Sequence, residues 1–334
     1  MASPHLPDKI DGLNAAATQH CALLAAIELD IFTSLKDGSL TVEQIADAIA
    51  VDSSRLALML DPLVAVGLLS VNDNIFSNSS EANDFLVRGS PAYMGSEPRM
   101  VRPSFGWGTM LKTADSIRAG APQEKLDFSG MSAEDLDERF YSSFCPIAVA
   151  EGRDLATKYD FSSHRHLLDV GGGTGGLAIA VTEAYPNMRA TVADLPNVTP
   201  ITERYLREAG ASDRIDIVSA DVTQDSLGGT YDLVVLKSLI QVLSRDQAQR
   251  ALHNVAAHME PGASLFILGI VLDSSRTSPE RALFFNMRAI NIYAQGEAYT
   301  EQEYRDWLAD AGLVGFERHP QDDGRSIVMA RKPD

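Results

Sequence analysis

A glycine-rich loop, DVGGGTG at residues 169–175, carries the clearest chemical signal in this 334-residue chain. Gly171, Gly173 and Gly176 satisfy the G-x-G-x-x-G spacing that lets backbone approach a nucleotide. A pyrophosphate held there would face the carboxylate of Asp169 and find no neighbouring lysine or arginine. A cofactor with an ammonium and a sulfonium group would instead be attracted to that carboxylate. The loop therefore favours a cationic nucleoside cofactor over a dinucleotide.

Two further aspartates end the next two apolar runs. Asp194, in ADLP, can accept hydrogen bonds from both hydroxyls of a ribose, and Asp221, in SADV, can accept one from the exocyclic amine of adenine. Open α/β sheets bind ligands at the carboxyl ends of their strands. Carboxylates at three successive strand ends therefore predict one cofactor-binding crevice.

A parallel sheet is needed to position these acids, and the pattern from residue 166 predicts one. Five short apolar runs are separated by stretches of helix length, the βαβ rhythm of a sheet with helices on both faces. The last two runs lack such a stretch and predict an antiparallel hairpin. The expected strands are HLLDV, RATVADL, IDIVSADV, YDLVVLKSL, SLFILGIVL, GFERHP and SIVMARK. We expect an α/β fold with a Rossmann-like, mostly parallel sheet.

The first hundred residues predict helices instead. Apolar residues recur at helical spacing over 14–35, and Thr41 with Gln44 forms a capping-box signature for a helix over 41–50. A segment at 53–71, a turn at 72–74 and a short hairpin complete a winged-helix-like pattern. Residues 41–80 contain one basic residue and five acidic ones, so we expect a dimerising role rather than DNA contact.

A Gly-, Pro- and Ser-rich stretch at 88–105 separates the two patterns. We expect a dimerisation domain over 1–100 and a cofactor-binding domain over 101–334. The second domain would include a helical segment at 105–160 that contributes to the acceptor pocket.

The net charge of −18 disfavours nucleic acid and anionic membranes as partners. Cys21 and Cys145 lie far apart and match no metal-ligand spacing, so we expect reduced thiols and no metal site. No apolar run reaches 18 residues, and the first ten residues show no signal-peptide pattern. These features predict a soluble cytoplasmic protein.

Further motifs match one family over nearly the whole chain. They are ADLP at 193–196, PGA at 261–263 and YTEQEYRDWLADAGL at 299–313. With DVGGGTG and the winged-helix-like front, they resemble the S-adenosylmethionine-dependent small-molecule O-methyltransferases, the type that includes plant caffeate and bacterial polyketide enzymes. The resemblance implies the class I methyltransferase fold, S-adenosylmethionine as cofactor, and a homodimer whose interleaved N-terminal domains help to close the acceptor pocket. The cofactor-binding residues implied are Asp169, Gly171, Gly173, Asp194, Leu195, Asp221, Val222 and Lys237.

The same resemblance locates the catalytic position. Relatives that methylate hydroxyl groups carry HD after the fourth strand, and this histidine removes the proton of the acceptor. Here Gln241 takes the histidine position, and an amide cannot accept a proton near neutral pH. The two acids that orient the histidine in relatives fall near Gly269 and near Ala298, which follows Glu297. We therefore expect no histidine base, with Gln241 positioning the acceptor by a hydrogen bond.

Two segments are expected to line the acceptor pocket, RFYSSF at 139–144 and FFNMRAINIY at 284–293. Arg288 or Arg139 would bind a carboxylate of the acceptor. The acceptor-binding candidates are Tyr141, Phe144, Asn286, Met287, Arg288, Asn291 and Tyr293.

Other histidines are poor substitutes for the missing base. His253 and His258 fall on a helix outside the sheet, and their spacing of five does not share one helical face. His164 and His166 precede the first strand, at the wrong end for the chemistry. His20 lies in the region expected to form the dimer.

Sulfur methylation is the leading hypothesis, because a thioether has a free lone pair and no proton to lose. Its attack on the sulfonium methyl needs only alignment and removal of water. A small methylthio acid fits, such as the methylthio-hydroxybutyrate on the route to dimethylsulfoniopropionate. The alternatives are an O-methyltransferase of a phenolic or polyketide acceptor that uses another base, and a tailoring enzyme, such as a cyclase or decarboxylase, that binds the cofactor without transferring methyl.

Overall fold

The computed structural model describes residues 7–90, 93–94 and 107–334. The chain divides into two compact units, Met1–Trp107 and Gly108–Asp334. The predicted domain boundary at residues 100 and 101, and most of the predicted connection at 88–105, lie outside the described residues.

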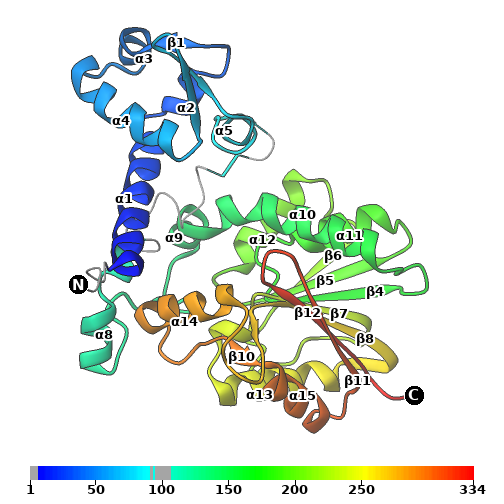
Figure 1. The fold of residues 1–334 in the computed structure, drawn as a ribbon. Helices are drawn as coiled ribbons and strands as arrows, with labels where there is room; N and C mark the ends of the chain where they lie inside the picture. The colour runs from blue at the N-terminus through cyan, green and yellow to red at the C-terminus, as the bar shows by residue number, and fades with distance from the viewer. Residues whose placement is uncertain (1–6, 91–92, 95–106) are drawn as a thin grey trace. The chain divides into compact units, whose positions relative to one another are not determined.

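The N-terminal unit packs helices around a small antiparallel sheet of strand order β1-β3-β2. Its elements are α1 (Asp8–Glu28), α2 (Ile31–Ser34), β1 (Leu40–Thr41), α3 (Val42–Ile49), α4 (Ser53–Ala65), β2 (Leu69–Asn72), β3 (Ile75–Asn78) and α5 (Ser80–Phe85) (Figure 1). The capping box of Thr41 and Gln44 is confirmed at the start of α3. The helix expected over 14–35 is interrupted at Asp30, whose left-handed backbone (φ 61°) separates α1 from α2. Asp73 and Asn74 also have positive φ, as the tight turn between β2 and β3 requires.

The C-terminal unit is built on a seven-stranded sheet within residues 108–334, of order β11-β12-β8-β7-β4-β5-β6. The strands are β4 (His166–Val170), β5 (Arg189–Asp194), β6 (Ile215–Ser219), β7 (Tyr231–Lys237), β8 (Met259–Gly269), β11 (Val314–Pro320) and β12 (Ser326–Arg331). β4 to β8 run parallel, and β12 pairs antiparallel with both β8 and β11. The predicted mostly parallel sheet with a terminal antiparallel hairpin is confirmed.

Helices flank this sheet on both faces (Figure 1). α10 (Ser142–Lys158), α11 (Gly176–Ala184) and α12 (Thr199–Glu208) pack on one face, and α13 (Arg245–Ala257) and α15 (Glu301–Asp310) on the other. The other helices from residue 107 on are α7 (Trp107–Met110), α8 (Thr113–Ala119), α9 (Ala133–Leu136), the π-helix η1 (Asp137–Tyr141), the 3₁₀-helix η2 (Ile240–Val242) and α14 (Glu280–Ile292). Two short strands, β9 (Val271–Leu272) and β10 (Tyr299–Thr300), pair in parallel beside them. Within the described ranges, no helix is both long and apolar enough to span a bilayer.

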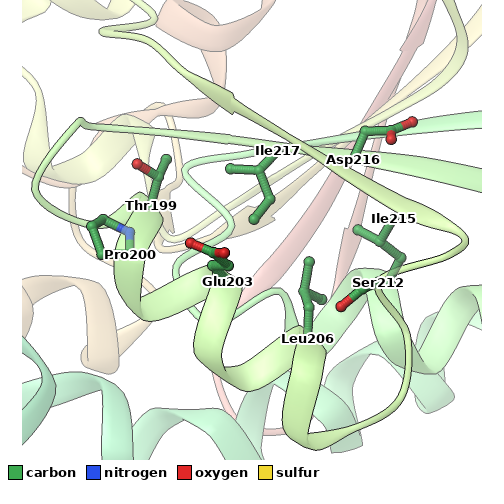
Figure 2. Close-up of a pocket in the computed structure, with 8 residues that line it drawn as sticks. All are labelled: Thr199, Pro200, Glu203, Leu206, Ser212, Ile215, Asp216 and Ile217. Atoms are coloured by element: carbon green, nitrogen blue, oxygen red, sulfur yellow. The ribbon is translucent and has the colours of Figure 1, made fainter.

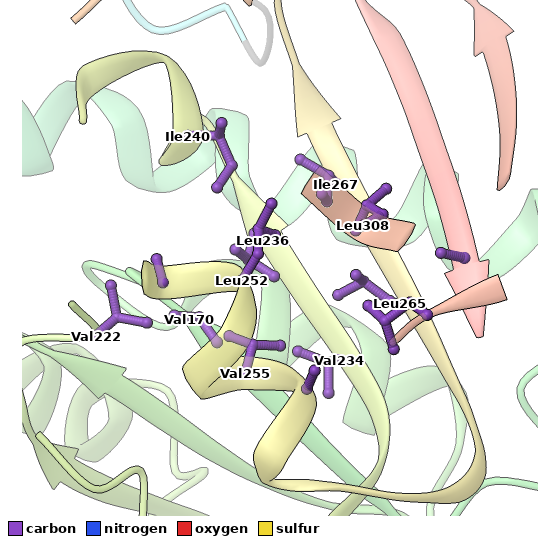
Figure 3. Close-up of a cluster of buried hydrophobic side chains, with 14 of the residues drawn as sticks. Val170, Val222, Val234, Leu236, Ile240, Leu252, Val255, Leu265, Ile267 and Leu308 are labelled. Atoms are coloured by element: carbon purple, nitrogen blue, oxygen red, sulfur yellow. The ribbon is translucent and has the colours of Figure 1, made fainter. Parts of the chain in front are cut away.

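Alternation along the central strands divides the core into two layers. On β7, Val234 and Leu236 join the cluster that contains Leu252 of α13 and Leu308 of α15 (Figure 3). Leu233 and Val235 point to the opposite layer, with α10 and α11. Both faces of β7 are buried. A register shift of one residue would turn every β7 side chain into the layer packed for its neighbours, and this cost fixes the register of the sheet.

One helix-length stretch does not form a helix. Residues 220–230, between β6 and β7, are turns. The Asp221 side chain accepts the N–H of Thr223 at 2.9 Å, and Asp225 accepts the N–H of Asp221 at 2.9 Å. These local side-chain bonds compete with helical ones, and Gly228 and Gly229 follow. The prediction of a helix in this connection was wrong. Asp221 still lies near the carboxyl end of β6, two residues after the strand.

Candidate active site

Adjacent strands bring the three predicted acids to one edge of the sheet. β4, β5 and β6 are neighbours and parallel, so their carboxyl ends lie side by side. Asp169 is the fourth residue of β4, Asp194 is the last of β5, and Asp221 follows β6 by two residues. The geometry is that of the ligand-binding edge of an open α/β sheet.

The glycine loop packs too closely for side chains. A Cβ on Gly173 (φ 57°) would lie 2.5 Å from Cε1 of Tyr141, and one on Gly171 (φ 66°) would lie 3.1 Å from Leu239. Gly172 has no positive φ, but a Cβ there would lie 2.7 Å from Cγ of Asp169. The glycines therefore bring the chain against the Asp169 carboxyl group and the Tyr141 ring.

Asp169 is 1 % exposed, and among the described residues neither of its carboxylate oxygens has a hydrogen-bond partner. Burial raises the pKa of Asp169 to about 7, the nearby Asp194 carboxylate adds to the rise, and the Ala178 backbone N–H, which lies near the carboxyl group without forming a regular hydrogen bond, opposes it. A buried carboxylate without a partner is costly. A bound cation would remove that cost, so this position fits an ammonium or sulfonium group.

Asp194 is buried but well bonded. Its Oδ2 accepts the N–H of Gly173 and its Oδ1 accepts the N–H of Leu195, both at 2.8 Å. Burial raises the pKa of Asp194 to about 6, and these two backbone bonds oppose the rise. Asp194 thus ties the end of β5 to the glycine loop, and its remaining lone pairs are available to a ligand.

Tyr141 packs against the glycine loop. Burial raises the pKa of its phenol well above the usual value, and the Asp194 carboxylate adds to the effect. Tyr141 was predicted to line the acceptor pocket, and the structure places its ring against Gly173. Phe144, three residues further along, is half-buried on α10.

The residues after β6 are held by their own loop. Asp221 accepts bonds from the Thr223 hydroxyl at 2.8 Å and from Gln224 Nε2 at 3.2 Å. Val222 is 8 % exposed, and its carbonyl accepts Asn254 Nδ2 at 2.8 Å. These contacts fix the loop that carries the third acid.

Lys237, the last residue of β7, pairs with a carboxylate from α10. Its Nζ lies 3.0 Å from Oε2 of Glu151, and both side chains are mostly buried. Glu151 also pairs with Arg325, at the start of β12. A cofactor contact by Lys237 would therefore use N–H donors of its ammonium group that do not point at Glu151.

Gln241, at the predicted catalytic position, lies in η2 and is 7 % exposed. Its Oε1 accepts the backbone N–H of Ile270 at 2.9 Å. A Cβ on Gly269 would lie 2.6 Å from the same oxygen. The structure thus brings Gln241 and Gly269 into direct contact.

The loop before β10 packs against the backbone of Gln241. A Cβ on Gly296 would lie 2.8 Å from the carbonyl oxygen of Gln241. Ala298 is fully buried, and its N–H donates to Oδ1 of Asn286 at 2.6 Å. Glu297 is engaged by two guanidinium groups, those of Arg245 at 3.2 Å and Arg276 at 3.5 Å. These ion pairs give Glu297 two structural partners.

The histidines of residues 108–334 are bonded elsewhere. His253 pairs with Asp310 at 2.8 Å on an exposed surface. His258 Nδ1 lies 2.9 Å from the carbonyl oxygen of Asn254, and its Nε2 accepts the N–H of Leu227 at 3.2 Å and lies at the same distance from the Ser226 hydroxyl. His164 contacts Ser264, and His166 contacts Thr191 near the amino ends of the strands. His319 bonds to Tyr159 at 2.9 Å.

Helix α14 carries most of the other acceptor candidates. Asn291 is fully buried and uses both ends of its amide: Oδ1 accepts the Ser116 hydroxyl at 2.8 Å and Nδ2 donates to Thr113 at 2.9 Å. An acceptor contact by Asn291 would have to replace one of these bonds. The Arg288 guanidinium lies 5.4 Å from the Phe285 ring centroid.

Met287 is 39 % exposed. Burial raises the pKa of Tyr293 to about 12, and Arg288 lowers it in part. The side chain of Arg139, the other predicted carboxylate partner, lies outside what the structure describes.

A separate pocket of about 450 Å³ lies between α12 and edge strand β6 (Figure 2). It contains none of the predicted site residues. Its lining residues are Thr199, Pro200, Glu203, Leu206, Ser212, Ile215, Asp216 and Ile217.

Three residues of the site were not predicted from the sequence. Gly172 is needed for close approach to Asp169, Glu151 is the partner of Lys237, and Ile270 anchors Gln241 through its backbone. The run of three consecutive glycines at 171–173, of which Gly172 is the second, was a usable signal for Gly172. Glu151 and Ile270 had none, because each depends on a contact between elements distant in sequence.

Comparisons with known proteins agree with this fold and identify its family. An O-methyltransferase domain model matches residues 122–314, and an O-methyltransferase dimerisation domain model matches residues 15–88. A 3-hydroxy-5-methyl-1-naphthoate 3-O-methyltransferase from Streptomyces sahachiroi is 29 % identical over 87 % of this chain and 84 % of its own. The N,N-dimethyltransferase OxyT from Streptomyces rimosus is 26 % identical over 96 % of this chain and 95 % of its own.

Among solved structures, human N-acetylserotonin methyltransferase in complex with S-adenosylmethionine has a TM-score of 0.77 at 24 % identity, with full coverage of both chains. That likeness is one of fold. The methyltransferase domain match by itself spans more than half of the 334 residues. The chain therefore belongs to the O-methyltransferase family of enzymes.

Proposed function

We propose that this protein transfers a methyl group from S-adenosylmethionine to a small molecule without a histidine base. The observation that carries the proposal is the contact between Gln241 and Gly269. An amide stands at the position of the family's base, and no carboxylate stands at the position of its orienting acid. An amide oxygen bonded to a backbone N–H cannot remove a proton near pH 7.

The residues of the sheet edge fit the cofactor. Bound S-adenosylmethionine would supply an electrophilic methyl group on a sulfonium. The buried, unpartnered Asp169 carboxylate would attract the cationic methionine part. Asp194 would accept from the ribose, and Asp221, beside Val222, from the adenine amine. Gly171 and Gly173 leave room for close approach, and Leu195 and Lys237 border the same edge.

The acceptor atom is proposed to be sulfur, in a thioether or thiol such as that of a small methylthio acid. When a thioether attacks, a carbon–sulfur bond forms as the methyl–sulfonium bond breaks. The positive charge passes to the product and no proton is released. The protein therefore only has to align the acceptor and exclude water. Gln241 suffices for such a reaction, whereas a phenol would still need a base.

The N-terminal unit is proposed to form a homodimer, as the match of residues 15–88 to the dimerisation domain supports. An obligate interface of this kind buries over about 2,000 Å² in total. Light scattering at micromolar concentration should give twice the mass of the chain, and a monomer would contradict this part of the proposal.

The decisive experiment is single-turnover methyl transfer between pH 6 and pH 8, with a panel of thioethers, thiols and phenols and detection of S-adenosylhomocysteine. With a thioether as acceptor and S-adenosylmethionine saturating at every pH, so that the titration of Asp169 does not enter the rate, a base-free enzyme should show no ascending limb in the range where a histidine titrates. His253→Asn is a matched control, because this exposed histidine should leave the profile unchanged.

Transfer to a phenol with an ascending limb, and none to any sulfur compound, would favour an O-methyltransferase with another base. Tight cofactor binding without S-adenosylhomocysteine from any acceptor would favour a tailoring enzyme that does not transfer methyl.

A further inference from the structure

The Gln241 amide is held in one orientation. A backbone N–H only donates, so the group of Gln241 that lies 2.9 Å from the Ile270 nitrogen must be the amide oxygen. The assignment of Oε1 and Nε2 therefore follows from chemistry. The acceptor end of Gln241 is used inside the protein.

Two glycines keep the side chain in place. A Cβ on Gly269 would lie 2.6 Å from Oε1, so this conformation requires residue 269 to lack a side chain. Gly296 packs against the backbone of residues 241 and 242, with its Cβ position 2.8 Å from the Gln241 carbonyl oxygen. The backbone of Gln241 therefore has little room to shift towards Gly296, while Gly269 leaves space for Oε1 and the Ile270 N–H holds it.

This leaves the two N–H donors of Nε2. Gln241 is 7 % exposed, and among the described residues Nε2 makes no hydrogen bond. Nε2 is not one of the fully buried polar atoms that lack a partner, so water can reach it, and an acceptor molecule that displaces this water must replace its hydrogen bonds. Gln241 follows the carboxyl end of β7, which lies beside that of β8 because Lys237 pairs with Leu268. A bound acceptor molecule can form a hydrogen bond with Nε2 only through an atom that carries a lone pair.

We infer that Gln241 determines specificity by donating from Nε2 to a carboxylate or carbonyl oxygen of the acceptor, close to the atom that is methylated. This inference rests on the proposed function and deepens it by naming the substrate class. The methyl acceptor is a sulfur compound that also carries a carboxylate or carbonyl oxygen, such as a thioether acid, rather than a plain sulfide. The side chain removes no proton and is a positioning residue. Gly269 serves the same purpose indirectly, because it gives Oε1 its space.

The test uses the full-length protein and two matched acceptors, 4-(methylthio)butanoate and butyl methyl sulfide. Wild-type protein should use the acid with a KM at least about tenfold lower, the scale of one hydrogen bond to a charged group. Gln241→Glu keeps an oxygen for the Ile270 N–H and replaces the donor end by an acceptor with negative charge. It should raise the KM for the acid by more than about tenfold, with a much smaller change for the sulfide.

Gly269→Ala should act in the same direction, because its Cβ displaces the amide. Affinity for S-adenosylmethionine, measured by calorimetry, should stay unchanged in both variants and shows that they are folded. Equal KM values of Gln241→Glu and wild type for the acid would overturn the inference, as would a wild-type preference for the sulfide.

Failure of the proposed function gives a different result. If wild-type protein methylates no sulfur compound but does methylate a phenol, sulfur methylation is wrong. The inference is then tested with 3-hydroxy-1-naphthoate and 2-naphthol. A carboxylate preference that Gln241→Glu abolishes would uphold the role of Gln241, and no preference would end it.

Discussion

The two halves of the sheet's carboxyl edge differ in how much unsatisfied polarity they hold. On the β4–β6 side, Asp169 is a buried carboxylate without a hydrogen bond, next to a second buried carboxylate, Asp194. On the β7–β8 side, Gln241 is neutral and its acceptor end is bonded to backbone. The first half is arranged to attract a cation. The second half can orient a neutral or anionic molecule but cannot take its proton.

This difference teaches that cofactor binding and proton removal are separable in this fold. The cofactor side depends on charges and glycines in β4, β5 and their loops. The acceptor side depends on η2, the end of β8 and the loop before β10. In the function proposed above, the cofactor side is complete while the acceptor side has no histidine base.

The largest expected effect is at Gly173. Gly173→Ala places a Cβ 2.5 Å from the Tyr141 ring in a left-handed backbone. Overpacking of about 1–3 kcal/mol, added to backbone strain of about 1 kcal/mol, should weaken S-adenosylmethionine binding by about 100-fold. Calorimetry with the purified protein measures this directly.

Gly210→Ala is the matched control. Gly210 also has a positive φ, 64°, but nothing lies within 4 Å of its Cβ position. It should lower the melting temperature slightly and leave cofactor affinity unchanged. Equal losses of affinity in both variants would show that backbone strain, and not the contact with Tyr141, is responsible.

The next effect is at Asp194. Asp194→Ala removes the acceptor of the Gly173 and Leu195 N–H groups as well as the proposed ribose contact. The loss of a charge-assisted hydrogen bond, about 1–3 kcal/mol, should weaken S-adenosylmethionine binding by about 30-fold. Asp310→Ala, at an exposed ion pair on α15, should leave it unchanged. Tight binding of NADH to the wild-type protein would contradict the cofactor assignment itself.

A smaller effect, about tenfold per pH unit, concerns Asp169. Its pKa of about 7 in the folded protein means that below pH 7 the carboxyl group must lose a proton before it can pair with a cation. Affinity for S-adenosylmethionine should therefore fall by up to about tenfold per pH unit between pH 7 and pH 6. Asp169→Asn should bind more weakly at pH 8 and lose most of this dependence. A flat wild-type profile would argue against direct pairing.

The same pKa has a consequence for stability. It exceeds the ordinary value of 3.8, so the folded protein holds an extra proton between about pH 4 and pH 7. Without ligand, the free energy of unfolding should fall as the pH rises through this interval and level off above it. Asp169→Asn should therefore melt at a higher temperature than the wild type at pH 8.

The sequence predicted the sheet and the glycine loop of the C-terminal unit well because their signals are local. Alternating apolar runs, three terminal acids and a glycine loop occupy short segments, and each segment reports its own conformation. Residues 220–230 were misjudged because Asp221 and Asp225 form turns by side-chain bonds that length alone does not reveal. Asn291 was assigned to the acceptor pocket, but its bonds to α8 depend on residues 113 and 116, far away in the chain.

The contact between Gly269 and Gln241 also constrains evolutionary change. While glutamine occupies position 241, any side chain at 269 meets its amide oxygen at 2.6 Å. An acid gained first at 269 would therefore displace the Gln241 amide from its bond to Ile270, and a histidine gained first at 241 would have no acid at 269 to orient it. Under the proposed function, either single change removes the positioning of the acceptor by the amide before an oriented base exists. An enzyme that uses a base is therefore reached only when both positions change.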